Sequence, residues 1–189
     1  MKKLLFILLI ITTLASCVVG DLTGLTSGYK HLSPAEKGKI VTLADDASIA
    51  ELAKSDTIYR MTSHPLKNYL KAVKGEVVLY FWSPNCASSV CYSLESVQEL
   101  CTQRHQKLIV FTEYFDLPQI EAQKLAALDF PLFSIHAEFY KTDFCDKYVK
   151  RFLADLLNMK KVPDDVLYNR YFLFSDSKFI NSVNDISTD

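Results

Sequence analysis

The chain has 189 residues, of which 49 % are hydrophobic and 23 % are charged, and its formal net charge is -1 at pH 7. So small a charge provides no general field for binding nucleic acid or anionic lipid, and we expect no nucleic-acid partner. Twelve Phe and ten Tyr predict a packed globular body. The length fits one domain together with a leader and a tether.

The first residues predict export. Two lysines at positions 2 and 3 precede an apolar stretch over 4–11, which has the length of a signal peptide and is too short to span a bilayer. Residues 14–17 (LASC) resemble the bacterial lipobox, which implies cleavage before Cys17 and attachment of lipid to its thiol. We therefore expect a signal peptide over 1–16 and a body that is anchored to a membrane without crossing it.

A tether is expected next. Residues 17–46 begin with the lipidated Cys17, are rich in Gly, Ser, Thr and Lys, and show no sustained period of a helix or strand. We expect the folded domain over 47–189. No acidic run follows Cys17, so we expect the body to lie in the periplasm of the bacterial cell envelope.

From residue 47 onwards, the periodicities of strands and helices alternate. Residues 76–82 (EVVLYFW) form a continuous apolar run, which predicts a strand buried on both faces. After turn residues at 83–85, apolar side chains recur at intervals of four, three and four, which predicts a helix. The order of elements predicts a mixed α/β sheet with helices on both faces. In chain order we expect a helix at 49–54, a strand at 57–61, a helix at 65–73, a strand at 76–82, a helix at 86–105, a strand at 108–111, a helix at 116–128, a loop or short strand at 131–139, a helix at 143–158, and a hairpin of strands at 171–174 and 178–180.

The strand over 76–82 and the residues after it carry a family resemblance. Residues 77–86 (VVLYFWSPNC) resemble the strand-to-helix segment of thioredoxin-like proteins, particularly exported thiol-disulfide oxidoreductases of the TlpA and ResA type. Trp82 ends the strand and Cys86 follows four residues later, as in that family. Residues 171–180 are similar to the last two strands of the family. The resemblance covers about 57–183 and implies a thioredoxin-like fold.

Cys86 is the candidate nucleophile. A helix N-terminus favours thiolate over thiol, and the thiolate is the attacking species in disulfide exchange. The family's second Cys stands where this chain has Ser89, so Cys91 is the second thiol here. Helical α-carbons five residues apart are separated by about 8.6 Å, whereas disulfides need roughly 4.4 to 6.8 Å. Cys86 and Cys91 therefore pair only if the helix starts later or its first turn unwinds.

Other residues are expected to line this site. In the family, a cis-proline just before the penultimate strand faces the active thiol, and here that place holds Asn and Arg instead. Residues 114–116 (YFD) follow the next strand. They either border the site or, as the plainer interpretation, are a loop aromatic beside a helix cap. The expected lining residues are Trp82, Pro84, Asn85, Ser89, Asn169 and Arg170.

We expect this candidate thiol-disulfide oxidoreductase to exchange disulfides with exported proteins and to need neither a cofactor nor a metal. The main alternative is a redox-inactive thioredoxin-fold lipoprotein that serves as a binding or assembly module. In that case the cysteines are structural, because four of them remain beside Cys17 in an oxidising compartment. Cys101 has the spacing of a buried core residue, and its pairing with Cys145 is open.

Two further alternatives come from families that share the fold. Peroxiredoxins with two cysteines five apart are similar in that spacing, but they carry a proline where this chain has Leu79. Copper-delivering Sco proteins use two nearby cysteines and a distant histidine, for which His136 is the candidate. Their cysteines have C-x3-C spacing, whereas Cys86 and Cys91 have C-x4-C spacing.

Overall fold

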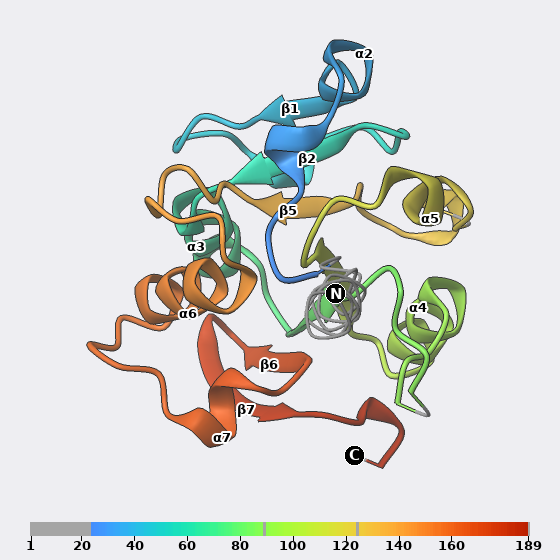
Figure 1. The fold of residues 1–189 in the computed structure, drawn as a ribbon. Coiled ribbons are helices and arrows are strands. Elements are labelled where there is room, and N and C mark those ends of the chain that lie inside the picture. Colours follow the sequence, from blue (N-terminus) through green and yellow to red (C-terminus); the bar gives the residue numbers. More distant parts are fainter. Residues whose placement is uncertain (1–23, 89, 124, 189) are drawn as a thin grey trace, which may run out of the picture.

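Seven strands form one mixed sheet in the order β1-β2-β5-β4-β3-β6-β7 (Figure 1). The computed structural model describes residues 24–88, 90–123 and 125–188. Strands β1 to β5 run parallel to one another, β6 runs antiparallel to β3, and β7 runs antiparallel to β6. The expected mixed α/β sheet is therefore confirmed. The strands are β1 (Ile40–Thr42), β2 (Ile58–Met61), β3 (Glu76–Trp82), β4 (Lys107–Thr112), β5 (Phe133–Ile135), β6 (Tyr171–Ser175) and β7 (Lys178–Val183).

Helices cover both faces of the sheet (Figure 1). Helices α3 and α6 lie on one face, and α4 and α5 lie on the other. The α-helices are α2 (Pro34–Lys37), α3 (Ser63–Ala72), α4 (Leu94–Gln103), α5 (Leu117–Glu121), α6 (Cys145–Leu156) and α7 (Asp164–Leu167), and the 3-10 helices are η1 (Tyr29–His31), η2 (Ile49–Glu51), η3 (Leu125–Ala127) and η4 (Ile186–Thr188).

Strand β3 divides the hydrophobic core into two clusters. Its odd-numbered residues over 77–81 join the cluster under α3 and α6, while its even-numbered residues over 78–82 join the cluster under α4 and α5. Successive side chains of a strand point to opposite faces, so a strand covered on both sides is apolar throughout. The prediction of a strand buried on both faces is confirmed.

The segment expected to be a tether over 17–46 joins the folded body within its described part. Residues 40–42 form the edge strand β1, which pairs with β2. Residues 24–28 lie at the carboxyl ends of the parallel strands. There, Ser27 N–H donates to the Asp143 carbonyl at 2.8 Å, and the Ser27 carbonyl accepts from Phe115 N–H at 2.8 Å. Gly28 has a φ of 74°, and a Cβ there would lie 2.9 Å from the Phe115 carbonyl oxygen. Cys17 and the expected signal peptide lie outside the described residues.

Three expected helices are shorter than their apolar spacing predicts, and the one expected at 86–105 is described with the candidate site. The helix at 49–54 is the 3-10 turn η2, and the helix at 116–128 ends at Glu121 and is followed by the 3-10 turn η3. Asp116 does cap α5 as expected, since its side chain accepts from Gln119 N–H. In the described ranges, no helix has the length and apolar character that crossing a membrane requires.

Phe152 on α6 tests the packing of the larger cluster. It is fully buried, and its ring centroid lies 5.3 Å from Phe111, 6.2 Å from Phe81 and 6.2 Å from Tyr140. We expect Phe152→Ala to lower the free energy of unfolding by about 3 to 5 kcal/mol, because it removes buried ring contacts and leaves a cavity. Urea-induced unfolding measures this loss. Ile180→Ala, at a side chain that is 61 % exposed, should change stability by no more than about 0.5 kcal/mol, and equal losses would contradict this core.

Candidate functional site

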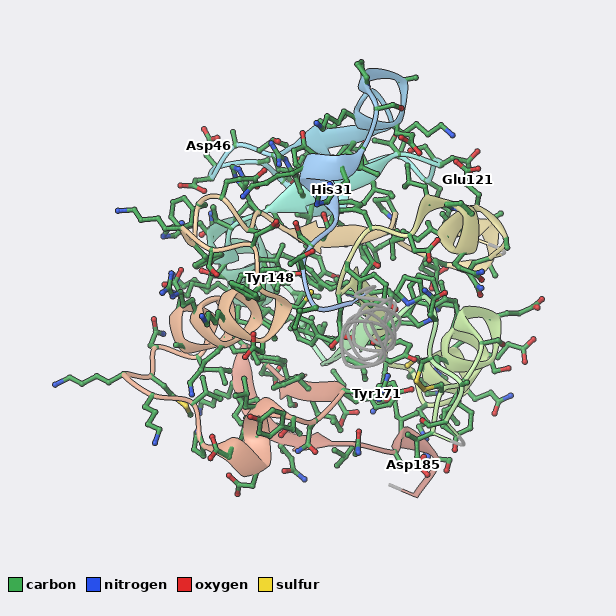
Figure 2. All side chains as sticks on the ribbon, viewed as in Figure 1. His31, Asp46, Glu121, Tyr148, Tyr171 and Asp185 are labelled. Atoms are coloured by element: carbon green, nitrogen blue, oxygen red, sulfur yellow. A yellow bond between two sulfur atoms is a disulfide. The ribbon has the colours of Figure 1, made fainter. Side chains whose placement is uncertain are left out.

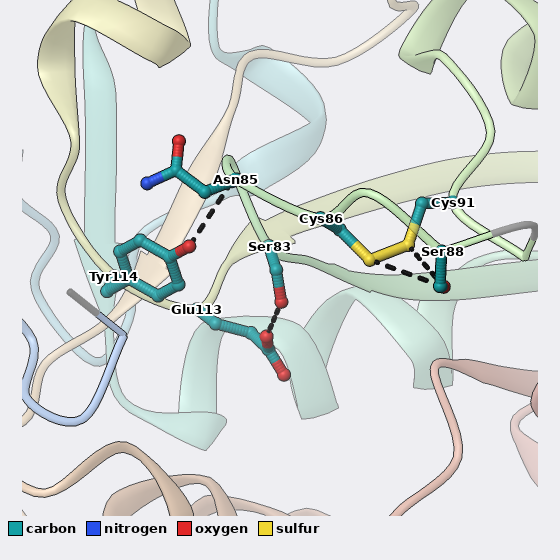
Figure 3. Close-up of a disulfide and its surroundings, with 7 residues drawn as sticks. All are labelled: Ser83, Asn85, Cys86, Ser88, Cys91, Glu113 and Tyr114. Atoms are coloured by element: carbon teal, nitrogen blue, oxygen red, sulfur yellow. Dashed lines mark hydrogen bonds between the residues drawn. A yellow bond between two sulfur atoms is a disulfide. The ribbon is translucent and has the colours of Figure 1, made fainter. Parts of the chain in front are cut away.

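Cys86 and Cys91 form a disulfide at the carboxyl edge of the sheet, the edge at which the parallel strands end (Figure 3). Their α-carbons are 5.9 Å apart, inside the range that disulfides need. Both cysteines are partly exposed, in the loop that follows β3. We call residues 86–91 the disulfide loop.

The helix expected from residue 86 begins at Leu94. Ser93 is its N-cap, and the Ser93 hydroxyl accepts from Ser96 N–H. Before it, the chain makes turns in which Cys86 N–H donates to the Ser83 carbonyl and Cys91 N–H donates to the Ser88 carbonyl. This late start meets the condition for pairing derived from the sequence. The prediction that Cys86 lies at a helix N-terminus is wrong, so the thiolate preference based on the helix dipole does not apply to it.

Ser88 lies beside both sulfur atoms of the disulfide (Figure 3). Its Oγ is 3.1 Å from Cys91 Sγ and 3.6 Å from Cys86 Sγ. Disulfide sulfurs carry no hydrogen, so the hydroxyl is the donor in these contacts. Ser88 is exposed, which leaves this side of the disulfide open to solvent.

The base of the loop is tied to the chain that follows β4. Asn85 N–H donates to Tyr114 Oη at 3.2 Å, and Asn85 Nδ2 donates to Asp116 Oδ2 at 2.8 Å. Pro84 is buried beside them. Tyr114 and Asp116, for which the sequence favoured a plainer interpretation, therefore hold the expected lining residue Asn85 in place.

A carboxylate lies against Ser83, in the chain that leads into the disulfide loop (Figure 3). Glu113 directly follows β4, and the Ser83 hydroxyl donates to its carboxylate. Burial raises the pKa of Glu113, and the Ser83 hydrogen bond and the positive charge of Arg170 oppose this rise. The Glu113 N–H also donates to the Trp82 carbonyl at 2.9 Å, which joins the ends of β4 and β3.

The remaining expected lining residues take different places. Arg170 comes close to Glu113, and its carbonyl accepts from Phe81 N–H at 2.9 Å. Asn169 lines a cavity with Glu113 and Arg170, and its Nδ2 donates to the Ser182 carbonyl and to Ser182 Oγ. Trp82 is buried in the core under α4, and Ser89 lies outside the described residues. The structure thus brings Arg170 toward the site and assigns Asn169 to the turn before β6.

Sequence reasoning did not find Glu113 or Ser83. A signal for both was available, because each is the first residue after one of two neighbouring apolar strands. Carboxyl ends of adjacent parallel strands meet at one edge of a sheet, so polar residues that directly follow them come together.

Cys101 and Cys145 are free thiols on opposite sides of the sheet. Cys101 is buried on the inner face of α4, as the sequence predicted, while Cys145 begins α6 and packs against the other cluster. Desolvation raises the pKa of each thiol to about 11. The pairing of these two cysteines that the sequence left open does not occur.

His136 follows β5 at the same edge, but its neighbours are charged groups. Its Nε2 lies 3.7 Å from Glu138 Oε2, and burial together with the Arg60 charge lowers the pKa of His136. Across the described ranges, no group of three or more His, Cys, Asp or Glu side chains is placed to hold a metal ion.

Comparison with protein-family models, with curated proteins and with solved structures found no match for this chain. The chemistry of the site therefore has to be inferred from its own residues. These are a partly exposed disulfide, a hydroxyl that donates to it, and a carboxylate that accepts from nearby Ser83 and has a raised pKa.

The raised pKa of Glu113 makes stability depend on pH in a defined direction. The folded state holds this proton more tightly than the unfolded state, so its contribution is complete below the unfolded value of about 4.3 and is lost as pH rises through the folded value. We expect Glu113→Gln, which stays neutral, to gain stability relative to the wild type between about pH 4 and pH 8. Urea unfolding across this range measures the difference. Glu51→Gln, at an exposed carboxylate, is the matched control, and parallel wild-type and Glu113→Gln curves would contradict the assignment.

The free thiols should react slowly in the folded protein. With a pKa of about 11, each has roughly 0.1 % thiolate at pH 8, so alkylation by iodoacetamide should be about a hundredfold slower than for an ordinary cysteine. Cys86 and Cys91 should be alkylated only after reduction. Peptide mass spectrometry measures each site, and urea-unfolded protein is the control in which Cys101 and Cys145 react at the ordinary rate. Rapid labelling of both in the folded state would contradict the raised pKa values of the two thiols.

Proposed function

We propose that this protein is a lipid-anchored, thioredoxin-like protein of the bacterial envelope that exchanges disulfides with exported proteins. The observation that carries the proposal is the partly exposed Cys86–Cys91 disulfide in the loop that follows the interior strand β3. The antiparallel pair β6 and β7 beside β3 supports it, because the family resemblance implies a closing hairpin. The lipobox-like residues 14–17 support the anchor.

The exchange follows from the positions of the two sulfurs. A thiolate of the partner attacks Cys86 Sγ, the Cys86–Cys91 bond breaks, and Cys91 leaves as a thiolate that accepts the Ser88 hydrogen bond. A second thiolate of the partner then attacks the mixed disulfide and releases Cys86. The partner gains one disulfide, and Cys86 and Cys91 become two thiols after taking up the two protons. Each step is reversible, so a reduced loop and an oxidised partner run the same path backwards.

Exchange is tested by equilibrating the protein with glutathione buffers of graded redox ratio and alkylating the thiols at each ratio. We expect the Cys86–Cys91 disulfide to open and close reversibly while the fold is retained. A disulfide that stays closed until the protein unfolds would overturn the proposal. Cys91→Ser should accumulate glutathione on Cys86, and Cys145→Ser is the control that leaves the equilibrium unchanged.

Ser88 gives a second, graded test. A hydrogen bond to a charged group contributes about 1.5 to 3 kcal/mol, so Ser88→Ala should slow opening by glutathione by about tenfold or more through a poorer Cys91 leaving group. The opening rate is measured by taking samples at successive times and alkylating the thiols that have formed in each. Ser96→Ala, which changes an exposed serine on α4, is the matched control. Equal rates for Ser88→Ala and the wild type would remove Ser88 from the exchange.

One observation favours the alternative of a redox-inactive binding or assembly module. Helix α4 begins at Leu94, so neither cysteine has the helix N-terminus that lowers thiol pKa values in the family. In this module the disulfide only closes the loop. The double variant Cys86→Ser/Cys91→Ser would then retain every partner that the wild type binds, as measured by crosslinking in the envelope. The exchange function instead predicts that the double variant loses the partners held by mixed disulfides.

A further inference from the structure

We propose that the carboxyl edge of the sheet is the face that lies against the lipid bilayer. The inference rests on the proposed lipid anchor at Cys17. It deepens the proposed function, because the disulfide loop lies at the same edge as the surface described below.

Exposed apolar side chains gather at this edge. Leu25, Phe139, Phe144 and Tyr168 are 49 %, 47 %, 42 % and 72 % exposed, and they make up four of the seven large exposed hydrophobic residues in the described ranges. Phe139 and Phe144 belong to the loop between β5 and α6, and Tyr168 directly follows α7. We call these four residues the edge patch.

Backbone contacts join the patch to the segment that leads toward the anchor. Thr26 forms an isolated antiparallel bridge with Phe144, and the Leu25 carbonyl accepts from Cys145 N–H at 3.1 Å. Gly24 and Tyr168 line one cavity of about 260 Å³. The first described residues therefore lie among the patch residues, and in Figure 1 the blue segment that carries them passes in front of the sheet.

The length of chain to Cys17 limits how far this edge lies from the membrane. Leu25 is eight residues after Cys17, and a fully extended chain spans at most about 3.6 Å per residue, or roughly 29 Å in total. Lipid on Cys17 thus holds Leu25 within roughly 29 Å of the membrane surface, which is about the thickness of the hydrocarbon core of a bilayer.

The charges around the patch suit a lipid headgroup region. Lys147 Nζ lies 4.6 Å from the centre of the Phe144 ring, and Lys30 and Lys141 are exposed nearby. Of the acidic side chains near the patch, Asp143 accepts from Ser27 and pairs with Lys30, and Glu138 pairs with Arg60. Asp146 on α6 and the carboxylates of residues 164 and 165 on α7 are exposed. Apolar and aromatic side chains flanked by lysines are typical of surfaces that lie in the membrane interface.

The test uses the full-length lipidated protein in liposomes of phosphatidylethanolamine and phosphatidylglycerol with brominated acyl chains, which quench tryptophan on contact. Phe144→Trp places a reporter in the patch, and Ile180→Trp places a matched one on strand β7, at a side chain that is 61 % exposed. The wild type gives the baseline from the buried Trp82. We expect the Phe144→Trp emission to be quenched at least about twofold more than that of Ile180→Trp.

Leu25→Trp repeats the measurement from the neighbouring segment, in case one variant folds poorly. Equal quenching at the patch and control positions would overturn the inference and leave a protein partner as the occupant of the patch. Protein that fails to sediment with the liposomes would overturn the anchor and this inference together. Glutathione exchange measured on the same liposomes separates the outcomes, because loss of exchange with quenching retained would count against the redox function alone.

Discussion

The structure depends on one strand being buried on both faces. Strand β3 lies between β4 and β6 and sends alternate side chains into two separate hydrophobic clusters. Its apolar run ends at Trp82, and Ser83 is the first residue that reaches polar surroundings, where it donates to Glu113. The chain that leads into the disulfide loop therefore begins where the strand ends, and the two helix layers hold that point in place from both sides.

Elements with long apolar runs or strong periodicity could be predicted from the sequence, and short ones could not. The run over 76–82 and the amphipathic spacing of α6 are signals of many residues, whereas β1 has three residues and gains its order from pairing with β2. The loop before α4 was misjudged because Val90 has helical spacing from Leu94. The helix begins only at Leu94, because the Ser93 side chain accepts from Ser96 N–H and caps the helix there.

The site was predictable only in its local part. Trp82, Cys86 and Cys91 are close in sequence, so their spacing places them together. The contacts of Glu113 and Arg170 depend on the register between strands that are far apart in the chain, through the bonds from Glu113 N–H to Trp82 and from Phe81 N–H to Arg170. A single sequence carries no direct record of that register, which is why the Glu113 carboxylate beside Ser83 was missed.

Helix α4 keeps its own cap outside the ring that the disulfide closes, and this separates the redox state of the loop from the integrity of the helix. A covalent ring this short removes about 2 kcal/mol of chain entropy from the unfolded state. Folding and disulfide closure form one thermodynamic cycle, so the folded chain favours the oxidised loop over the reduced one by the same amount, about thirtyfold relative to the unfolded chain. The length of the ring therefore sets how strongly folding favours the disulfide over the two thiols.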